Sequence, residues 1–212
     1  MSRVLRRAVA RMFVVITSLI LSAGLSSATA IAGQPVTQTF NPPAPEFYDC
    51  SAIGAGTVCH GARLVDHPVA PTDVFCGSGA DMFEVYDQGL VHQLASRYYD
   101  RDGNLTKRVV HERWTDAQWS NPLSGEVVPY TQMNTSTEVL AIPGDLASST
   151  LANRGENIYR TSDGGKPIML SVGRMVFGPG DELIEFSGHQ WVVSAFYLGD
   201  PSVLDDVCSA LS

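Results

Sequence analysis

Basic residues are scarce in this sequence of 212 residues, which has 14 Lys and Arg against 22 Asp and Glu. Four of the 14, Arg3, Arg6, Arg7 and Arg11, lie at the very start. Without that first segment the net charge is 10 minus 22, or −12. Nucleic acids and anionic lipids are bound mainly through Lys and Arg. The charge therefore predicts no nucleic-acid partner and no attraction to an anionic membrane surface.

Motifs of metal, nucleotide and hydrolase chemistry are also missing. No Cys-x-x-Cys or His-Glu-x-x-His spacing occurs, so no metal site is predicted from motifs. The glycines of Gly54-Ala55-Gly56 are followed by Thr57-Val58-Cys59 rather than by a helix with Lys and Ser or Thr, which excludes a phosphate-binding loop. Ser171 has no Gly-x-Ser-x-Gly context. We therefore predict no cofactor and assign no catalytic residue.

The sequence has no unbroken apolar run of the roughly 20 residues that a transmembrane helix needs. The longest candidate, MFVVITSLILSAGL, is interrupted by Thr17, Ser18, Ser22 and Gly24. It follows basic residues and leads to Ser27-Ala28-Thr29-Ala30, which together form the pattern of a secretory signal peptide. We expect residues 1–30 to be removed on export. The product would be a secreted, extracellular protein with no membrane span.

The sequence has only four cysteines, an even number that can pair fully into disulfides, as in proteins of an oxidising compartment. Cys50, Cys59, Cys76 and Cys208 allow three pairings into two disulfides. We favour Cys50 with Cys59, which closes a short glycine-rich loop, and Cys76 with Cys208, which ties the two ends of the later part of the chain. In the chain-entropy model the long closure contributes about 5 kcal/mol and the short one about 2.7 kcal/mol.

Residues 31–71 show little hydrophobic periodicity, and the stretch QPVTQTFNPPAPEFYD is rich in Pro and Thr. Such a segment buries too little apolar surface to offset the entropy of ordering. We predict an extended arm, pinned locally by the small disulfide loop.

Residues 72–212 consist of short β-type runs separated by turn residues. Turns such as Asp-Gly, Asn-Pro and Gly-Pro-Gly between regularly spaced short runs indicate a single antiparallel all-β domain. We predict a meander that forms a small barrel or a barrel-like sandwich. The runs are MFEVYD, LVHQLASRYY, LTKRVVHERW, EVVPYTQMNTSTEVLAI, ENIYRT, PIMLSVGRMVF, ELIEF and QWVVSAFY.

One short helix is predicted at the C-terminus. Asp200 before Pro201 supplies an N-cap with proline at the first helical position. Val203, Val207 and Leu211 then recur four residues apart, which is the spacing of one buried helical stripe. Cys208 lies beside this stripe, and its disulfide would hold the helix on the β domain.

Several short motifs resemble a group of exported proteins of high-GC Gram-positive bacteria. They are Phe75-Cys76-Gly77, the hairpin that ends in Asn104-Leu105-Thr106-Lys107-Arg108, Gly173-Arg174 before a Gly-Pro-Gly turn, and Val207-Cys208. The resemblance covers about the last two thirds of the chain, the size of one ordinary domain. It implies a secretion signal and a β-rich fold, but no agreed activity, cofactor or catalytic residue.

His92 and His111 are the residues that most suggest chemistry. If the turn between them spans residues 100–103, His92 lies directly opposite His111, and the two imidazoles could touch or share an ion. His189 or Glu112 could then complete a metal site. The alternative is a pair of half-buried histidines that hydrogen-bond to their neighbours. A slip of one residue in the turn would break the pairing.

Aromatic residues are concentrated in or beside the expected strands. They predict either a packed core or a cavity that holds a small apolar ligand. The candidate ligand-facing residues are His92, His111, Tyr98, Trp114 and Trp191.

Three functions fit these observations. The first is a non-catalytic secreted protein that binds a small apolar ligand or a cell-surface component. The second is a secreted enzyme of the small-barrel isomerase or cyclase type that uses His92 and His111. The third is a protein-interaction module that acts through the proline-rich arm. A cavity between the strands favours the first, converging His and carboxylate groups favour the second, and a solid core with an exposed apolar patch favours the third.

Overall fold

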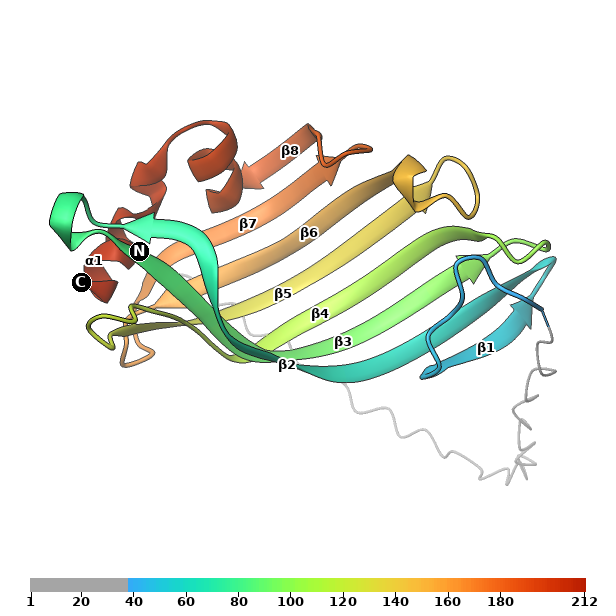
Figure 1. Ribbon diagram of the computed structural model, residues 1–212, viewed down its shortest axis with the longest axis horizontal. Helices are drawn as coiled ribbons and strands as arrows, with labels where there is room; N and C mark the ends of the chain where they lie inside the picture. The colour runs from blue at the N-terminus through green and yellow to red at the C-terminus, as the bar shows by residue number, and fades with distance from the viewer. Residues whose placement is uncertain (1–37) are drawn as a thin grey trace, which may run out of the picture. The chain divides into compact units, whose positions relative to one another are not determined.

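The computed structural model describes residues 38–212, which form one antiparallel sheet of eight strands and a helical C-terminal segment (Figure 1). The strands follow one another in chain order. The expected signal peptide and the first residues of the expected arm lie outside the described residues. The strands are β1 (Tyr48–Ile53), β2 (Gly56–Cys76), β3 (Phe83–Tyr99), β4 (Leu105–Ser120), β5 (Val127–Leu140), β6 (Ser149–Arg160), β7 (Pro167–Phe177) and β8 (Leu183–His189).

Short helices complete the described chain. Two single turns, η1 (Gly79–Asp81) and η2 (Leu146–Ser148), join strands. The C-terminal segment contains η3 (Val193–Tyr197), η4 (Pro201–Leu204) and α1 (Asp205–Leu211). Within residues 38–212, no helix has both the length and the hydropathy of a membrane span.

The sheet is strongly curved, and its two outermost strands, β1 and β8, do not pair with each other in the described part of the chain (Figure 1). The antiparallel meander that we expected is confirmed, whereas its closure into a barrel is not observed. We call the face that carries Val85, Trp119, Tyr130 and Tyr159 the inner face. These four side chains pack into one core with residues of the C-terminal segment, among them Val207.

Most of the expected N-terminal arm belongs to the sheet instead. Residues 48–71, which we expected in an extended arm, form β1 and most of β2, and β2 pairs with β3 from Thr57 opposite Tyr99 to Cys76 opposite Phe83. The prolines misled the prediction, because Pro68 and Pro71 lie at irregularities in the register, where a missing N–H breaks no ladder.

The residues before β1 also contact the sheet. Asn41 donates its backbone N–H to Gly103 O and accepts from Leu105 N, which makes a short bridge to the turn between β3 and β4. The ring of Phe40 packs 4.3 Å from that of Tyr99. In the same turn, the carboxylate of Asp100 accepts from two backbone N–H groups, as expected for an Asp-Gly turn.

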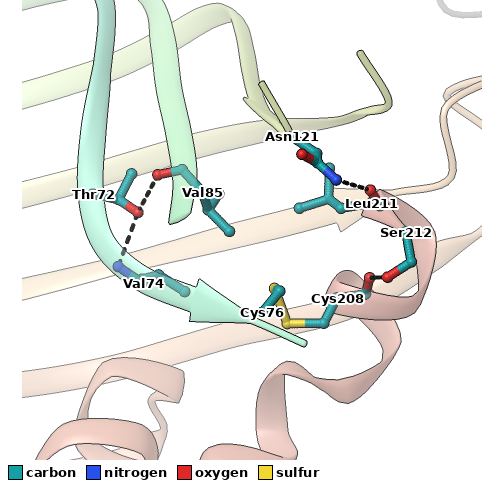
Figure 2. Close-up of a disulfide and its surroundings, with 8 residues drawn as sticks. All are labelled: Thr72, Val74, Cys76, Val85, Asn121, Cys208, Leu211 and Ser212. Carbon is teal, nitrogen blue, oxygen red and sulfur yellow. Dashed lines mark hydrogen bonds between the residues drawn. A yellow bond between two sulfur atoms is a disulfide. The ribbon is translucent and has the colours of Figure 1, made fainter. Parts of the chain in front are cut away.

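Both predicted disulfides, Cys50–Cys59 and Cys76–Cys208, are present. The second joins the end of β2 to α1 (Figure 2). Beside it, the side-chain amide of Asn121 donates to the Leu211 carbonyl, so the last turn of the chain is also tied to the β4–β5 connection. The predicted C-terminal helix is confirmed, although its first turn is a 3₁₀ turn capped by Asp200.

Candidate functional site

The inner face contains a cavity of about 320 Å³ beneath the C-terminal segment. It lies between the middle strands of the sheet and the first helical residues after β8. Its polar lining is mostly side-chain amides, from Gln132, Asn134, Asn153, Asn157 and Gln190, with Thr72, Asp87 and Ser171. Its aromatic lining consists of Trp119, Tyr130, Tyr159, Trp191 and Phe196.

Strand register brings the amides together in adjacent rows across the sheet. Gln132 of β5 lies opposite Asn157 of β6, which lies opposite Ser171 of β7. Two residues further along β5, Asn134 lies opposite Gly155 of β6. Because alternate residues of a strand share a face, the spacing of two along β5 keeps these polar side chains on the inner face.

A row of glycines leaves room beside the amides. Gly155 of β6, Gly173 of β7 and Gly188 of β8 lie opposite one another. A Cβ at Gly155 would come within 2.6 Å of the Met133 carbonyl oxygen, and one at Gly173 within 2.0 Å of the Ser187 carbonyl oxygen. The strands approach too closely for side chains at these positions, so the sheet carries no side chain at Gly155, which borders the cavity, or beside it at Gly173 and Gly188.

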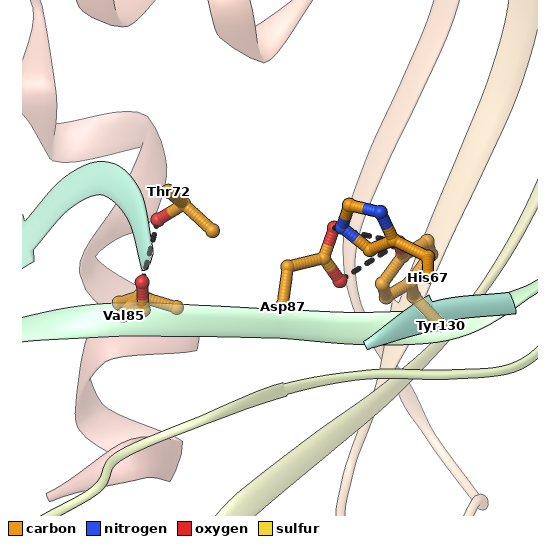
Figure 3. Close-up of polar contacts among 5 residues, drawn as sticks. All are labelled: His67, Thr72, Val85, Asp87 and Tyr130. Carbon is orange, nitrogen blue, oxygen red and sulfur yellow. Dashed lines mark hydrogen bonds and ion pairs between the residues drawn. The ribbon is translucent and has the colours of Figure 1, made fainter. Parts of the chain in front are cut away.

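Among residues 38–212, Asp87 is the one carboxylate that lines the cavity. The Tyr130 hydroxyl donates to both of its oxygens, at 3.0 and 3.2 Å, and His67 Nε2 lies 3.8 Å from Asp87 Oδ2 (Figure 3). Burial raises the pKa of Asp87, while the Tyr130 hydrogen bond and the His67 charge offset part of that rise. Burial and the nearby Asp87 charge raise the pKa of Tyr130. Tyr130 therefore stays protonated and acts as a donor.

The aromatic wall is continuous. The rings of Trp119 and Tyr159 lie 4.7 Å apart, those of Trp119 and Trp191 5.2 Å, and those of Tyr130 and Tyr159 5.1 Å. Phe196 extends the wall, 6.1 Å from Trp191. Such contacts hold the rings in fixed positions, so the cavity is bounded by a preformed apolar surface on this side.

Two buried polar atoms of the cavity lining have no hydrogen-bond partner among the described residues: Oδ1 of Asn134 and Nε1 of Trp191. The Trp191 indole lies near enough to the Tyr159 hydroxyl to lower its pKa, although burial and Asp87 dominate and raise it. The indole N–H makes no hydrogen bond of ordinary geometry. Buried groups of this kind are rare in native proteins and require an explanation.

His92 and His111 lie outside this site. Leu94 is opposite His111, and His92 is opposite Arg113, so the predicted direct pairing of the two histidines is wrong by two residues. Both histidines are exposed on the outer face, where His111 Nδ1 is hydrogen-bonded to the Thr135 hydroxyl at 2.8 Å. One residue of the offset arises in the turn, which places Tyr99 opposite Leu105 rather than Asn104, and the other arises from an irregularity in the β3–β4 ladder between Tyr98 and Tyr99.

The expected partners do not gather around these histidines. Glu112 lies on the inner face, where its carboxylate accepts from Gln93 Nε2, because adjacent positions of a strand point to opposite sides of the sheet. His189 is at the end of β8, opposite Val172. Within residues 38–212, no group of three or more His, Cys, Asp or Glu side chains is placed to hold a metal ion.

The other candidate ligand-facing residues divide between the faces. Tyr98 is on the outer face, under the ammonium group of Lys107. Trp114 is on the inner face beside the cavity, with its ring 5.2 Å from His67 and 6.2 Å from Tyr130. Trp191 lines the cavity itself.

Trp191 reaches the cavity because the chain after β8 is helical, whereas we expected residues 190–197 to form a strand. The β-branched and aromatic residues of that run fit a strand locally. They instead turn back over the inner face, where Trp191 and Val193 are buried. Tertiary burial decides the outcome against local propensity.

Sequence reasoning missed Asp87, Tyr130 and the amides. A signal was present in the strand at residues 127–140, where Tyr130, Gln132 and Asn134 alternate with outward-facing residues. A polar inner face at this spacing is the mark of a site rather than of a core. Comparison of the chain with protein-family models, with curated proteins and with solved structures found no match.

Proposed function

We propose that this protein is a non-catalytic, exported binding protein that takes a small ligand into the inner-face cavity. Support comes first from the lining of the cavity, which brings five side-chain amides together with an aromatic wall. One of these amides, that of Asn134, has a buried Oδ1 with no hydrogen-bond partner among the described residues, and an unsatisfied buried carbonyl costs about 1–3 kcal/mol.

The aromatic wall and the polar rows support a ligand with both an apolar face and polar edges. A cavity of 320 Å³ is at the small end of the range of about 300–1,000 Å³ typical of ligand pockets. The position of the site corresponds to the interior of the barrel that we expected from the sequence. The curve of the sheet and the C-terminal segment enclose it without requiring β1 to meet β8.

Export is part of the proposal. Two disulfides are compatible with an extracellular location, and the ligand would then be a small molecule or a component of a cell surface. The resemblance to exported proteins of high-GC Gram-positive bacteria stays a prediction.

The structure offers one reason to keep a second function, acid–base catalysis. Asp87, Tyr130 and His67 converge at the edge of the cavity, and a carboxyl group with a raised pKa is a common feature of active sites. An enzyme would use these residues rather than His92 and His111. Binding of a ligand that is recovered chemically unchanged separates the binding protein from the enzyme.

The test of the proposed function compares two matched variants of β6. Asn153→Phe fills the cavity, whereas Arg154→Phe adds the same ring to the outer face one residue along. A library of small molecules is screened by two-dimensional ¹H–¹⁵N NMR on the oxidised protein. We expect hits that shift the side-chain signals of Gln132, Asn134 and Trp191, that persist in Arg154→Phe and that are lost in Asn153→Phe. Hits confined to outer-face signals, or equally strong in both variants, contradict the proposal.

A further inference from the structure

The lining of the cavity narrows the chemical class of its ligand. We infer that the site takes a neutral, polyhydroxylated ring, that is, a saccharide unit, an inference that rests on the proposed function. Three properties of the lining lead to it: the kind of polar groups, the lack of positive charge and the placement of the aromatic faces.

The polar groups suit hydroxyls. A side-chain amide offers an acceptor and two donors, and a sugar hydroxyl donates and accepts at the same time. Five amides line one small cavity, and Gln132 and Asn157 stand side by side in opposed strands. Such an array can match hydroxyls on adjacent ring carbons. The amide of Asn134, whose Oδ1 has no partner among the described residues, is part of this array.

Charge excludes most alternatives. The described lining contains no Lys or Arg, so an anionic ligand would meet no counter-charge. Asp87 is the single acidic residue of the lining, both of its oxygens already accept from Tyr130, and its pKa is raised by burial. Its ability to hold a cation is therefore reduced. Neutral polar ligands meet no such penalty.

The aromatic faces suit the other side of a sugar ring. Trp191 and Phe196 come from the C-terminal segment, across the cavity from the strands that carry four of the five amides. A pyranose ring has hydroxyls at its edge and C–H groups on its faces, so it can lie against an aromatic ring while its edge bonds to amides. A wholly apolar ligand would cover amides such as those of Gln132 and Asn153 without giving them partners, which is costly.

The inner face remains polar beyond the cavity. Along β5, Asn134 is followed on the same face by Ser136 and Glu138, and Glu138 is paired with Arg108. These residues border a second hollow that also contains Arg97. A longer saccharide can therefore leave the cavity along the polar side chains of β5, which suits a glycan presented at a cell surface.

The test uses isothermal titration calorimetry on the oxidised full-length mature chain. The probes are D-glucose, N-acetyl-D-glucosamine and cellobiose as neutral saccharides, choline as an organic cation, and 1-octanol as an apolar ligand. We expect at least one saccharide to bind. Asn134→Leu should weaken that binding about tenfold, because the saccharide loses one hydrogen bond to the protein. Thr137→Val, on the outer face of the same strand, should leave it unchanged.

The outcomes separate the two proposals. Binding of choline or octanol alone, lost in Asn153→Phe, overturns the saccharide inference and leaves the proposed function standing. Saccharide binding that Asn134→Leu does not weaken, while its melting temperature is retained, also overturns the inference. If no probe binds and no library compound shifts the cavity signals, both fail.

Discussion

Asn134→Leu is expected to stabilise the protein, although it removes a polar side chain from the centre of the candidate site. Oδ1 of Asn134 is buried without a hydrogen bond among the described residues. Leucine has a similar shape and no group to satisfy. Removing an unpaired buried carbonyl recovers up to about 1–3 kcal/mol, and because Asn134 is only half-buried we take the low end, about 1 kcal/mol. Leucine is also better tolerated than asparagine in a strand.

For a domain of this size, about 1 kcal/mol corresponds to a rise of about 2–4 °C in melting temperature. The assay is thermal unfolding followed by circular dichroism, with the disulfides intact, and urea unfolding as an independent measure. Asn121→Leu is the matched control, because the amide of Asn121 is satisfied on both sides, donating to the Leu211 carbonyl and accepting from Leu123 N. The same substitution there should destabilise the protein by about 2–3 kcal/mol.

A fall of more than about 2 °C in Asn134→Leu, close to the behaviour of Asn121→Leu, would refute the reasoning. It would mean that Asn134 is held by the fold and not kept for a ligand. A gain in stability together with a loss of binding is the expected trade between folding and function.

Two further predictions concern the frame of the site. Replacing Cys76 and Cys208 by alanine should lower the free energy of unfolding by about 5 kcal/mol, because it opens a loop of 132 residues. Replacing Cys50 and Cys59 opens a loop of 9 residues and should lower it by less than about 3 kcal/mol. Equal losses in urea unfolding would contradict the loop-length argument. Asp87→Asn should be more stable than the wild type at pH values above the raised pKa of Asp87. The folded wild type binds the Asp87 proton more tightly than the unfolded chain does. The wild type therefore loses stability as the pH rises and this proton is released. The difference in unfolding free energy between the two proteins should shrink as the pH falls from the raised pKa toward 3.8 and should level off below 3.8, and a difference that does not change with pH would count against a raised pKa.

The sequence was most informative where local chemistry decides the structure. The Asp100 turn, the Asp200 cap and the spacing of Val207 and Leu211 each act within a few residues, and all were predicted correctly. The pairing of Cys76 with Cys208 followed from the idea that the ends of the domain should be tied together.

The site could not be predicted because it depends on register. Gln132 and Asn157 are 25 positions apart in the sequence and become neighbours only when β5 and β6 pair. The closing pair of the β3–β4 turn and the irregularity near Tyr98 each shift the register by one residue, which moves His92 away from His111. Trp191 reached the cavity only because its segment is helical in the folded chain.

The central claim is that a small ligand lies on the inner face, between the amide rows and the C-terminal segment. Nuclear Overhauser contacts between a bound compound and the assigned protein test it most directly. We predict contacts from the ligand to the ring of Trp191 and to the side-chain amides of Gln132 and Asn134. Contacts confined to outer-face methyl groups, such as those of Leu94 and Met133, would contradict the account.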